Sequence, residues 1–265
     1  LRLGAFIAYT GMYVGIPFSS VLITQWNKSV LGLPVTFLAS IPMTAELLAT
    51  MLCSLFLLPV YRRMDLKLLF SVSAVISALA NVLCFFSGSP ESLILLRFMS
   101  GIGFAGIKYS LNSIVSLGSL TPENTTSNLA ALNAGLLGGI TCGGTLGAVI
   151  ASSVNVHTSY LIAGVFIFTF VVAVLELSPW KLFRSNNKES AGKQSGSRLG
   201  VFSLVFKPAF LRYMVLVAIP MNIGLMFVVA FFPGFVSSLG LPDVTTSYGY
   251  LVNGLVGIYL GPVLL

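Results

Sequence analysis

The stretch RFMSGIGFAGIKYSLNS, from Arg97 to Ser113, is apolar enough for lipid and yet carries two positive charges. An α-helix turns by about 100° per residue, so the chain from Arg97 to Lys108 ends about 20° past three full turns. The two charges therefore share one face of a predicted helix whose other residues are mainly apolar or small. Charges in such a helix need protein or water beside them, which indicates a bundle rather than a single membrane anchor.

The rest of the chain is equally apolar. Of its 265 residues, 56% are hydrophobic and 8% are charged, and the mean hydropathy is +0.98. Soluble domains are about a quarter charged, so the composition predicts an integral membrane protein. Runs of about 20 apolar residues, enough for one helix to cross a bilayer, recur along the chain. We expect spans at residues 3–24, 35–60, 68–87, 93–117, 129–151, 159–177, 209–236 and 245–265.

The predicted fold class is all-α, a polytopic transmembrane helix bundle, because the apolar runs are continuous rather than alternating. The sequence shows no paired carboxylates and no Ser/His/Asp grouping, so we predict no catalytic residue and no enzyme. The cysteines Cys53, Cys84 and Cys142 are odd in number and lie inside apolar runs, which argues against a disulfide framework or a metal site. We expect no cofactor.

The net charge of +7 is explained by topology. If the N-terminus is inside, nearly all loop Lys and Arg residues fall on the cytoplasmic side and only Lys28 falls outside, as the positive-inside rule requires. Nucleic acid is therefore not an expected partner. We predict an integral protein of the plasma (inner) membrane, with a cytoplasmic N-terminus and a cytoplasmic segment at 178–207.

The segment SNNKESAGKQSGSR, Ser185 to Arg198, has the Ser, Gly and Lys composition of a flexible linker, although it would also suit an ordinary solvated loop. The tetrapeptide LGLP occurs before it at 31–34 and after it at 239–242, so the seventh predicted span restarts the pattern of the first. We predict a six-helix half at 1–177, a linker at 178–207 and the first two helices of a second half at 208–265.

At Arg97, Gly101 and Gly103 the sequence resembles the Arg-x-x-x-Gly-x-Gly pattern in the fourth helix of the major facilitator superfamily. The resemblance implies a bundle of twelve helices, of which about eight are present here, in a piece of a longer polypeptide. It associates Arg97 with proton coupling. The two glycines let another helix approach closely. An arginine near a helix end can also reach back to the lipid headgroups, and this alternative stays open.

In the fifth predicted helix, the series from Gly139 to Ala148 resembles the family motif Gly-x-x-x-Gly-Pro-x-x-Gly-Gly, with Gly144 in place of the proline. This motif is commonest among exporters that exchange substrate for protons. Gly139, Gly143 and Gly147 recur every four residues and share one helix face. Such a face can slide past a partner helix or pack statically against it.

The loop LPVYRRMDLKLL, from Leu58 to Leu69, stands where the family has a charged gate signature. Arg62 takes the place of its aspartate and Asp65 that of its second glycine, while Arg63 and Lys67 remain. The resemblance implies a gate role for Arg63 and Lys67. A plain positive-inside anchor is the alternative.

Glu46 lies about eleven residues into the second predicted helix, near mid-bilayer by length. A carboxyl group at that depth can exchange a proton or can be a structural, hydrogen-bonded group. We group Glu46 with Arg97 as the predicted proton-coupling residues.

The family lines its central cavity with the first, fourth and seventh helices, so the resemblance implies a substrate cavity formed by polar residues of these spans. Lys108 is its predicted charged contact, either for an anionic group of the substrate or for the coupling proton. A structural ion pair of Lys108 and ordinary aromatic packing of the tyrosines are the alternatives. The predicted cavity residues are Tyr9, Tyr13, Lys108, Asn112 and Asn222.

The predicted function is secondary active transport of a small solute by alternating access, proton-coupled and run as an exporter or antiporter. The expected partners are a small-molecule substrate, the lipid bilayer and protons, with a monomer as the expected oligomeric state. The alternative is a ligand-sensing membrane module of the same fold, coupled to a cytoplasmic output domain absent from this chain.

Overall fold

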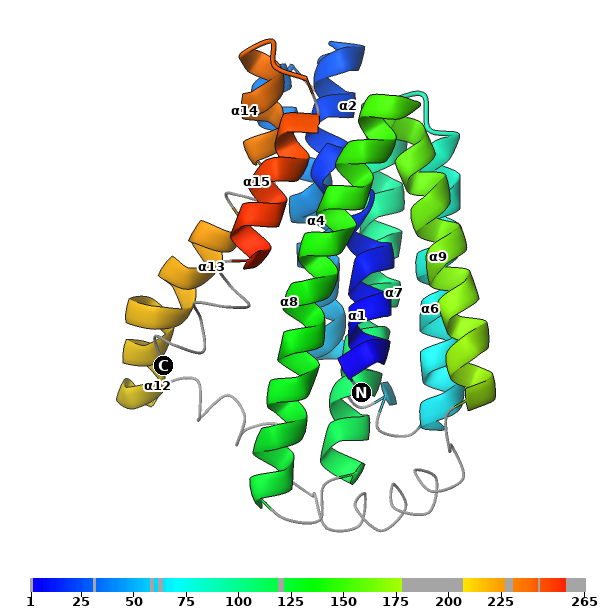
Figure 1. Ribbon diagram of the computed structural model, residues 1–265, viewed down its shortest axis with the longest axis vertical. Helices are drawn as coiled ribbons and strands as arrows, with labels where there is room; N and C mark the ends of the chain where they lie inside the picture. The colour runs from blue at the N-terminus through cyan, green and yellow to red at the C-terminus, as the bar shows by residue number, and fades with distance from the viewer. Residues whose placement is uncertain are drawn as a thin grey trace.

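The computed structural model describes residues 2–30, 32–57, 60–61, 64–118, 122–177, 207–226, 231–242 and 244–255. Within these ranges the chain is helical, and the only β-pairing is an isolated bridge between Val30 and Leu33. Long helices run side by side, up and down the molecule (Figure 1). The predicted all-α class is confirmed.

The first span is a broken helix. It consists of α1 (Arg2–Tyr13), the short 3-10 helix η1 (Ile16–Phe18) and α2 (Ser19–Trp26). Pro17 causes the break, because it has no N–H to donate to the carbonyl of Tyr13 one turn earlier. The chain tightens there instead, and the N–H of Phe18 donates to the carbonyl of Gly15 at 3.3 Å.

The second and third spans follow as α3 (Val35–Leu38) with α4 (Ile41–Phe56), and then α6 (Leu66–Phe85). Asp65 caps the start of α6, where its Oδ1 accepts a hydrogen bond from the backbone N–H of Lys67 at 2.9 Å. The acidic residue that replaces the family's glycine therefore serves as a helix cap.

The longest helices are α7 (Pro90–Gly118), α8 (Pro122–Ser153) and α9 (Val156–Leu177). Helices α7 and α8 each begin with proline, which suits the first turn because its missing N–H would have no partner there. Helix α7 packs between α4 and α6, α8 packs along α1, and α9 packs against α6. Two clusters of buried apolar side chains fill the spaces between these helices.

Beyond the linker region the described chain forms shorter helices. Helix α15 packs against α8, and α14 contacts α2. Figure 1 shows α14 and α15 beside the upper part of the bundle, with α12 and α13 farther out. These elements are α12 (Pro208–Tyr213), the π-helical turn η2 (Met214–Ala218), α13 (Ile219–Met226), α14 (Phe232–Ser238) and α15 (Val244–Leu255).

We call the end of the bundle that holds residues 26–30, 32–35, 85–90 and 153–156 the upper end, as in Figure 1, and the opposite end the lower end. In the described part of the chain, 5 helical segments are long and apolar enough to cross a membrane. They are Leu3–Trp26, Val35–Phe56, Leu66–Phe85, Pro90–Leu117 and Asn124–Ser153, and Val156–Val172 and Pro208–Val217 are shorter apolar helices.

Candidate functional site

A buried ion pair lies between the second and fourth spans. Arg97 of α7 is 0% exposed, and Glu46 of α4 is 3% exposed. The guanidinium Nη2 of Arg97 donates to Oε2 of Glu46. A lone charge at this depth would be costly in lipid, so the pairing explains how the apolar helix accommodates its arginine. Arg97 points into packed protein and does not reach toward the headgroups.

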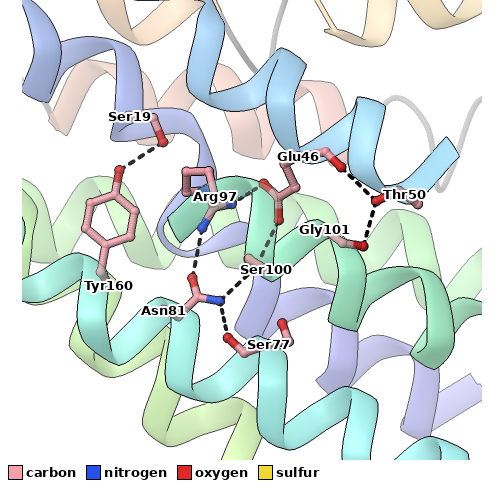
Figure 2. A network of polar contacts seen from close by, with 9 residues as sticks. All are labelled: Ser19, Glu46, Thr50, Ser77, Asn81, Arg97, Ser100, Gly101 and Tyr160. Atoms are coloured by element: carbon pink, nitrogen blue, oxygen red, sulfur yellow. Dashed lines mark hydrogen bonds and ion pairs between the residues drawn. The ribbon is translucent and has the colours of Figure 1, made fainter. Parts of the chain in front are cut away.

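Two further polar side chains close a hydrogen-bonded ring around this pair (Figure 2). The Oδ1 of Asn81, on α6, accepts from Nη1 of Arg97 at 2.9 Å. The hydroxyl of Ser100 donates to Oε1 of Glu46 at 3.1 Å. The Nδ2 of Asn81 in turn donates to Ser100 Oγ at 3.2 Å. Both carboxylate oxygens and two guanidinium nitrogens therefore have partners, supplied by three different spans.

Glycines bring the three helices close enough for this ring to form. A Cβ atom at Gly101 would lie 2.9 Å from the Cβ of Ala49 on α4, and one at Gly103 would lie 2.7 Å from the backbone N of Ser77 on α6. The hydroxyl of Thr50 also donates to the carbonyl of Gly101 at 3.1 Å. Larger residues at either glycine would push α7 away from its neighbours.

A tyrosine from the sixth span covers another side of Arg97. The Cζ atom of Arg97 lies 5.9 Å from the centroid of the Tyr160 ring, within the range of a cation–π contact. The Tyr160 hydroxyl shares a hydrogen bond with Ser19 Oγ on α2 at 2.9 Å. Figure 2 shows this second link beside the ring of four.

Sequence reasoning selected Glu46 and Arg97 but missed their companions. Asn81 left a usable signal, because an amide inside an apolar run needs hydrogen-bond partners. Ser100 lies three residues after Arg97 and so shares its helix face. Tyr160 left no signal, since single aromatic residues are common in apolar helices.

Lys108 lies in different surroundings from Arg97. Its side chain is exposed, as are those of Asn112 and Ser116 on the same face of α7. Within the described residues no ion pair joins Lys108 to a carboxylate. The span Pro90–Leu117 has its midpoint beside Phe104, so Lys108 lies about 7 Å along the axis from that midpoint. An exposed polar stripe thus occupies the lower half of α7.

Of the other predicted cavity residues, the two tyrosines are packed in the core. Tyr9 and Tyr13 are buried, at 5% and 6% exposed, and their rings stack at 6.4 Å. The Tyr9 ring also makes an edge contact with Phe104 at 5.4 Å, so the structure places both tyrosines in packed protein beside α7. Asn222 belongs to α13, and its side chain lies outside the described part of the structure.

The three glycines of the fifth span face the first span, α1 and the residues just after it. A Cβ atom at Gly139 would lie 2.6 Å from the carbonyl oxygen of Phe6, and one at Gly143 would lie 2.6 Å from that of Thr10. At Gly147 the nearest atom is the carbonyl oxygen of Val14. The two backbones are therefore in close contact over the whole series.

The neighbouring Gly144 faces α15 instead. A Cβ atom there would lie 3.1 Å from the Tyr250 ring. Helix α8 is thus held between the first span and α15.

Of the predicted gate residues, Lys67 is exposed at the lower end and makes the backbone bond to Asp65 described above. Arg62 and Arg63 lie outside the described residues. The gate role of Arg63 and Lys67 therefore stays a prediction. Among the described residues, no group of three or more His, Cys, Asp or Glu side chains is placed to hold a metal ion.

An all-helical bundle whose described part has 5 helical segments long and apolar enough to cross a membrane defines a polytopic membrane protein. The family model described as Major Facilitator Superfamily matches residues 1–265, and the chain belongs to this family. It is a membrane transporter of the major facilitator type, a class whose members are in general not enzymes. No curated protein and no solved structure matches the chain.

Proposed function

We propose that this protein moves a small solute by secondary active transport, and that Glu46 takes up and releases the coupling proton. The observation that carries the proposal is the Glu46–Arg97 ion pair, which is sealed between α4, α6 and α7. Ionisable residues within a membrane domain are costly to keep there, and they typically mark ion or substrate pathways.

Glu46 is the better proton carrier of the two. An arginine guanidinium keeps its proton in proteins, whereas a carboxyl group exists in both states. Pairing with Arg97 and the hydrogen bond from Ser100 stabilise the ionised form of Glu46, and burial stabilises its neutral form. A movement that separates α4 from α7 weakens the first effect and so favours proton uptake. This is how a rearrangement of the helices would be coupled to a proton.

For the substrate we propose the exposed stripe of Lys108, Asn112 and Ser116. The ammonium group of Lys108 offers a positive charge and three hydrogen-bond donors to an anionic group. The amide of Asn112 and the hydroxyl of Ser116 add hydrogen-bonding capacity. The stripe begins about 16 Å along α7 from Arg97. Helix α7 would then link the proton site to the substrate site. The positive charge of Lys108 makes a small anionic solute the favoured substrate class.

The direction we propose is export in exchange for protons, by alternating access. The direction rests on the resemblance of the α8 glycine series to the motif of exporters that exchange substrate for protons. The close contact of this series with the first span supports movement of α8 during alternating access, and not its direction. We further propose that the protein acts as a monomer in the plasma (inner) membrane. Its N-terminus and residues 178–207 would then be cytoplasmic, in keeping with the Lys and Arg distribution.

The proposal is tested by infrared difference spectroscopy of the purified protein in liposomes, recorded between high and low pH. We expect a band from a protonated carboxyl group that appears on acidification and is absent from Glu46→Gln. Glu91→Gln is the matched control, because Glu91 is an exposed carboxylate at the start of α7. The same band in Glu46→Gln and in the parent protein would refute a proton-carrying role for Glu46.

A further inference from the structure

Arg97 can form further interactions beyond its ion pair with Glu46. Its Nε has no hydrogen-bond partner in the described structure, although the side chain is fully buried. The centroid of the Tyr160 ring lies 5.9 Å from the Cζ atom of Arg97. Because arginine stays charged, neutralising Glu46 would leave this buried positive charge without its counter-charge. An electron-rich ring already within reach is then the favoured destination for the guanidinium.

Other titratable side chains also face the pair. They are Tyr13 from α1, Cys84 from α6 and Tyr160 from α9. None of them carries a charge near neutral pH in its ordinary state. Of the three, Tyr160 has both a ring contact with Arg97 and a hydrogen bond to another span.

Tyr160 is fastened to the broken part of the first span at two points. Its hydroxyl is hydrogen-bonded to Ser19, the first residue of α2, and both side chains are buried. Its ring lies directly on Gly15, where a Cβ atom would be 2.6 Å from the ring carbon Cδ1. A shift of the ring would therefore displace the chain on both sides of η1.

Residues 14–18 are suited to act as a hinge. Pro17 interrupts the regular hydrogen bonds of the helix, and the chain passes through a turn and a 3-10 helix before α2 resumes. Such breaks absorb changes in backbone angles that a continuous helix resists. The upper part of the first span, α2, can then tilt relative to α1.

We propose that Tyr160 transmits the charge state of the Glu46–Arg97 pair to α2, with residues 14–18 as the hinge. The inference rests on the proposed function, in which Glu46 binds the coupling proton. On protonation the guanidinium moves toward the Tyr160 ring, and the ring moves Gly15 and Ser19 with it. Tyr160 is thus a positioning residue, which connects the proton site in the core to the upper end of the bundle.

Trp26, the last residue of α2, provides the reporter. The chain has 2 tryptophans, so Trp180→Phe leaves Trp26 as the only one. The centroid of the His157 ring lies 6.0 Å from that of the Trp26 ring, so His157→Gln is included in every protein tested to leave no imidazole beside the reporter. The purified full chain in liposomes is titrated with acid while Trp26 emission and the carboxyl infrared band are followed together.

In this parent background we expect Trp26 emission to shift over the same pH range as the Glu46 band. Tyr160→Phe keeps the ring on Gly15 but removes the hydroxyl, and Ser19→Ala removes the same bond from its other side. In both variants the infrared band should persist while the Trp26 shift becomes smaller, because the ring contact with Gly15 remains but the hydrogen bond to α2 is gone. Tyr61→Phe, which removes a hydroxyl from a ring packed against Tyr109, should keep both signals.

The outcomes separate the two proposals. A Trp26 shift of undiminished size in both Tyr160→Phe and Ser19→Ala would overturn the proposed link from the Tyr160 hydroxyl to α2. The link would also be refuted by a titrating Glu46 band with no Trp26 shift in the parent. A Glu46 band that never appears in the parent would instead refute the proposed proton carrier. Two variants on opposite sides of one hydrogen bond keep the test valid if one of them fails to fold.

Discussion

The side-chain amide of Asn81 accepts a hydrogen bond from Arg97 at 2.9 Å and donates one to Ser100 at 3.2 Å, so a single residue of α6 contacts Arg97 directly and Glu46 through Ser100. Its Nδ2 also reaches the carbonyl of Ser77 at 2.8 Å. The third span therefore fixes the geometry of an ion pair that belongs to the second and fourth.

Asn81→Leu fills a similar volume but removes the side-chain amide. Nη1 of Arg97 then loses its acceptor, and Oγ of Ser100 loses a donor. We expect the free energy of unfolding to fall by about 1–3 kcal/mol, the usual cost of an unsatisfied buried polar group. Circular dichroism during denaturation of the purified protein measures the change. Asn112→Leu is the matched control, because this amide is exposed on α7, and it should change stability by about 0.5 kcal/mol or less. Equal losses in the two variants would contradict the role of Asn81.

The ion pair gives a second prediction. Arg97→Leu leaves Glu46 buried without a counter-charge, which should cost about 3–5 kcal/mol of unfolding free energy. The double variant Arg97→Leu with Glu46→Leu should recover part of that loss, because no unpaired charge remains. The same denaturation measurement on both single variants and the double variant gives the coupling energy. Purely additive losses would show that the two charges do not stabilise one another.

Much of this fold could be predicted from the sequence, because lipid leaves the chain few choices. Apolar runs placed the fourth span at 93–117 and the structure has it at Pro90–Gly118, with the proline at the first helical position. The first span was expected as one helix over 3–24, and the structure breaks it at residues 14–18. Pro17 carried the signal for that break.

The site was less predictable. Glu46 and Arg97 were selected because charges are rare in such helices, but their direct contact depends on how α4 packs on α7, which no local pattern specifies. The same holds for Tyr160, whose importance comes from Gly15 and Arg97 on other spans. Helical spacing placed Arg97 and Lys108 on one face of α7 but could not predict that one is buried and the other exposed, because the neighbours of that face differ along its length.

The close contact of α8 with α1 gives a third prediction. At Gly143 even one methyl group would lie 2.6 Å from the Thr10 carbonyl oxygen, so Gly143→Ala should cost about 1–3 kcal/mol of unfolding free energy. Gly138→Ala is the control on the same helix, because its methyl group would meet only the Phe6 ring at 3.3 Å. Thermal denaturation compares the two. If Gly138→Ala lost as much stability as Gly143→Ala, backbone contact with α1 would not be the cause.

The proposed orientation is tested by labelling. Ser29 is exposed at the upper end and Lys67 is exposed at the lower end. In a background without native cysteines, Ser29→Cys should react with a membrane-impermeant thiol reagent in intact cells. Lys67→Cys should react only after the membrane is permeabilised, because the positive-inside rule places that end in the cytoplasm. The reverse pattern would invert the proposed topology.

Lys108 provides the last prediction, on substrate class. Because its side chain is exposed, Lys108→Ala should leave unfolding free energy within about 0.5 kcal/mol of the parent. A charge-assisted hydrogen bond contributes about 1.5–3 kcal/mol, so loss of the ammonium group should weaken binding of an anionic solute about 10- to 100-fold. Pooled anionic and neutral metabolites, screened by thermal shift on the purified protein, identify the ligand, and calorimetry then compares the variants.

Lys108→Arg separates charge from geometry in the same measurement. The guanidinium keeps the positive charge but is planar and longer, so binding should be intermediate between the parent and Lys108→Ala. Lys28→Ala is the matched control, since Lys28 is also an exposed lysine but lies at the upper end, away from α7's polar stripe. An anionic ligand that binds Lys108→Ala as tightly as the parent would remove Lys108 from the substrate site, because no other change in that variant compensates for the lost charge.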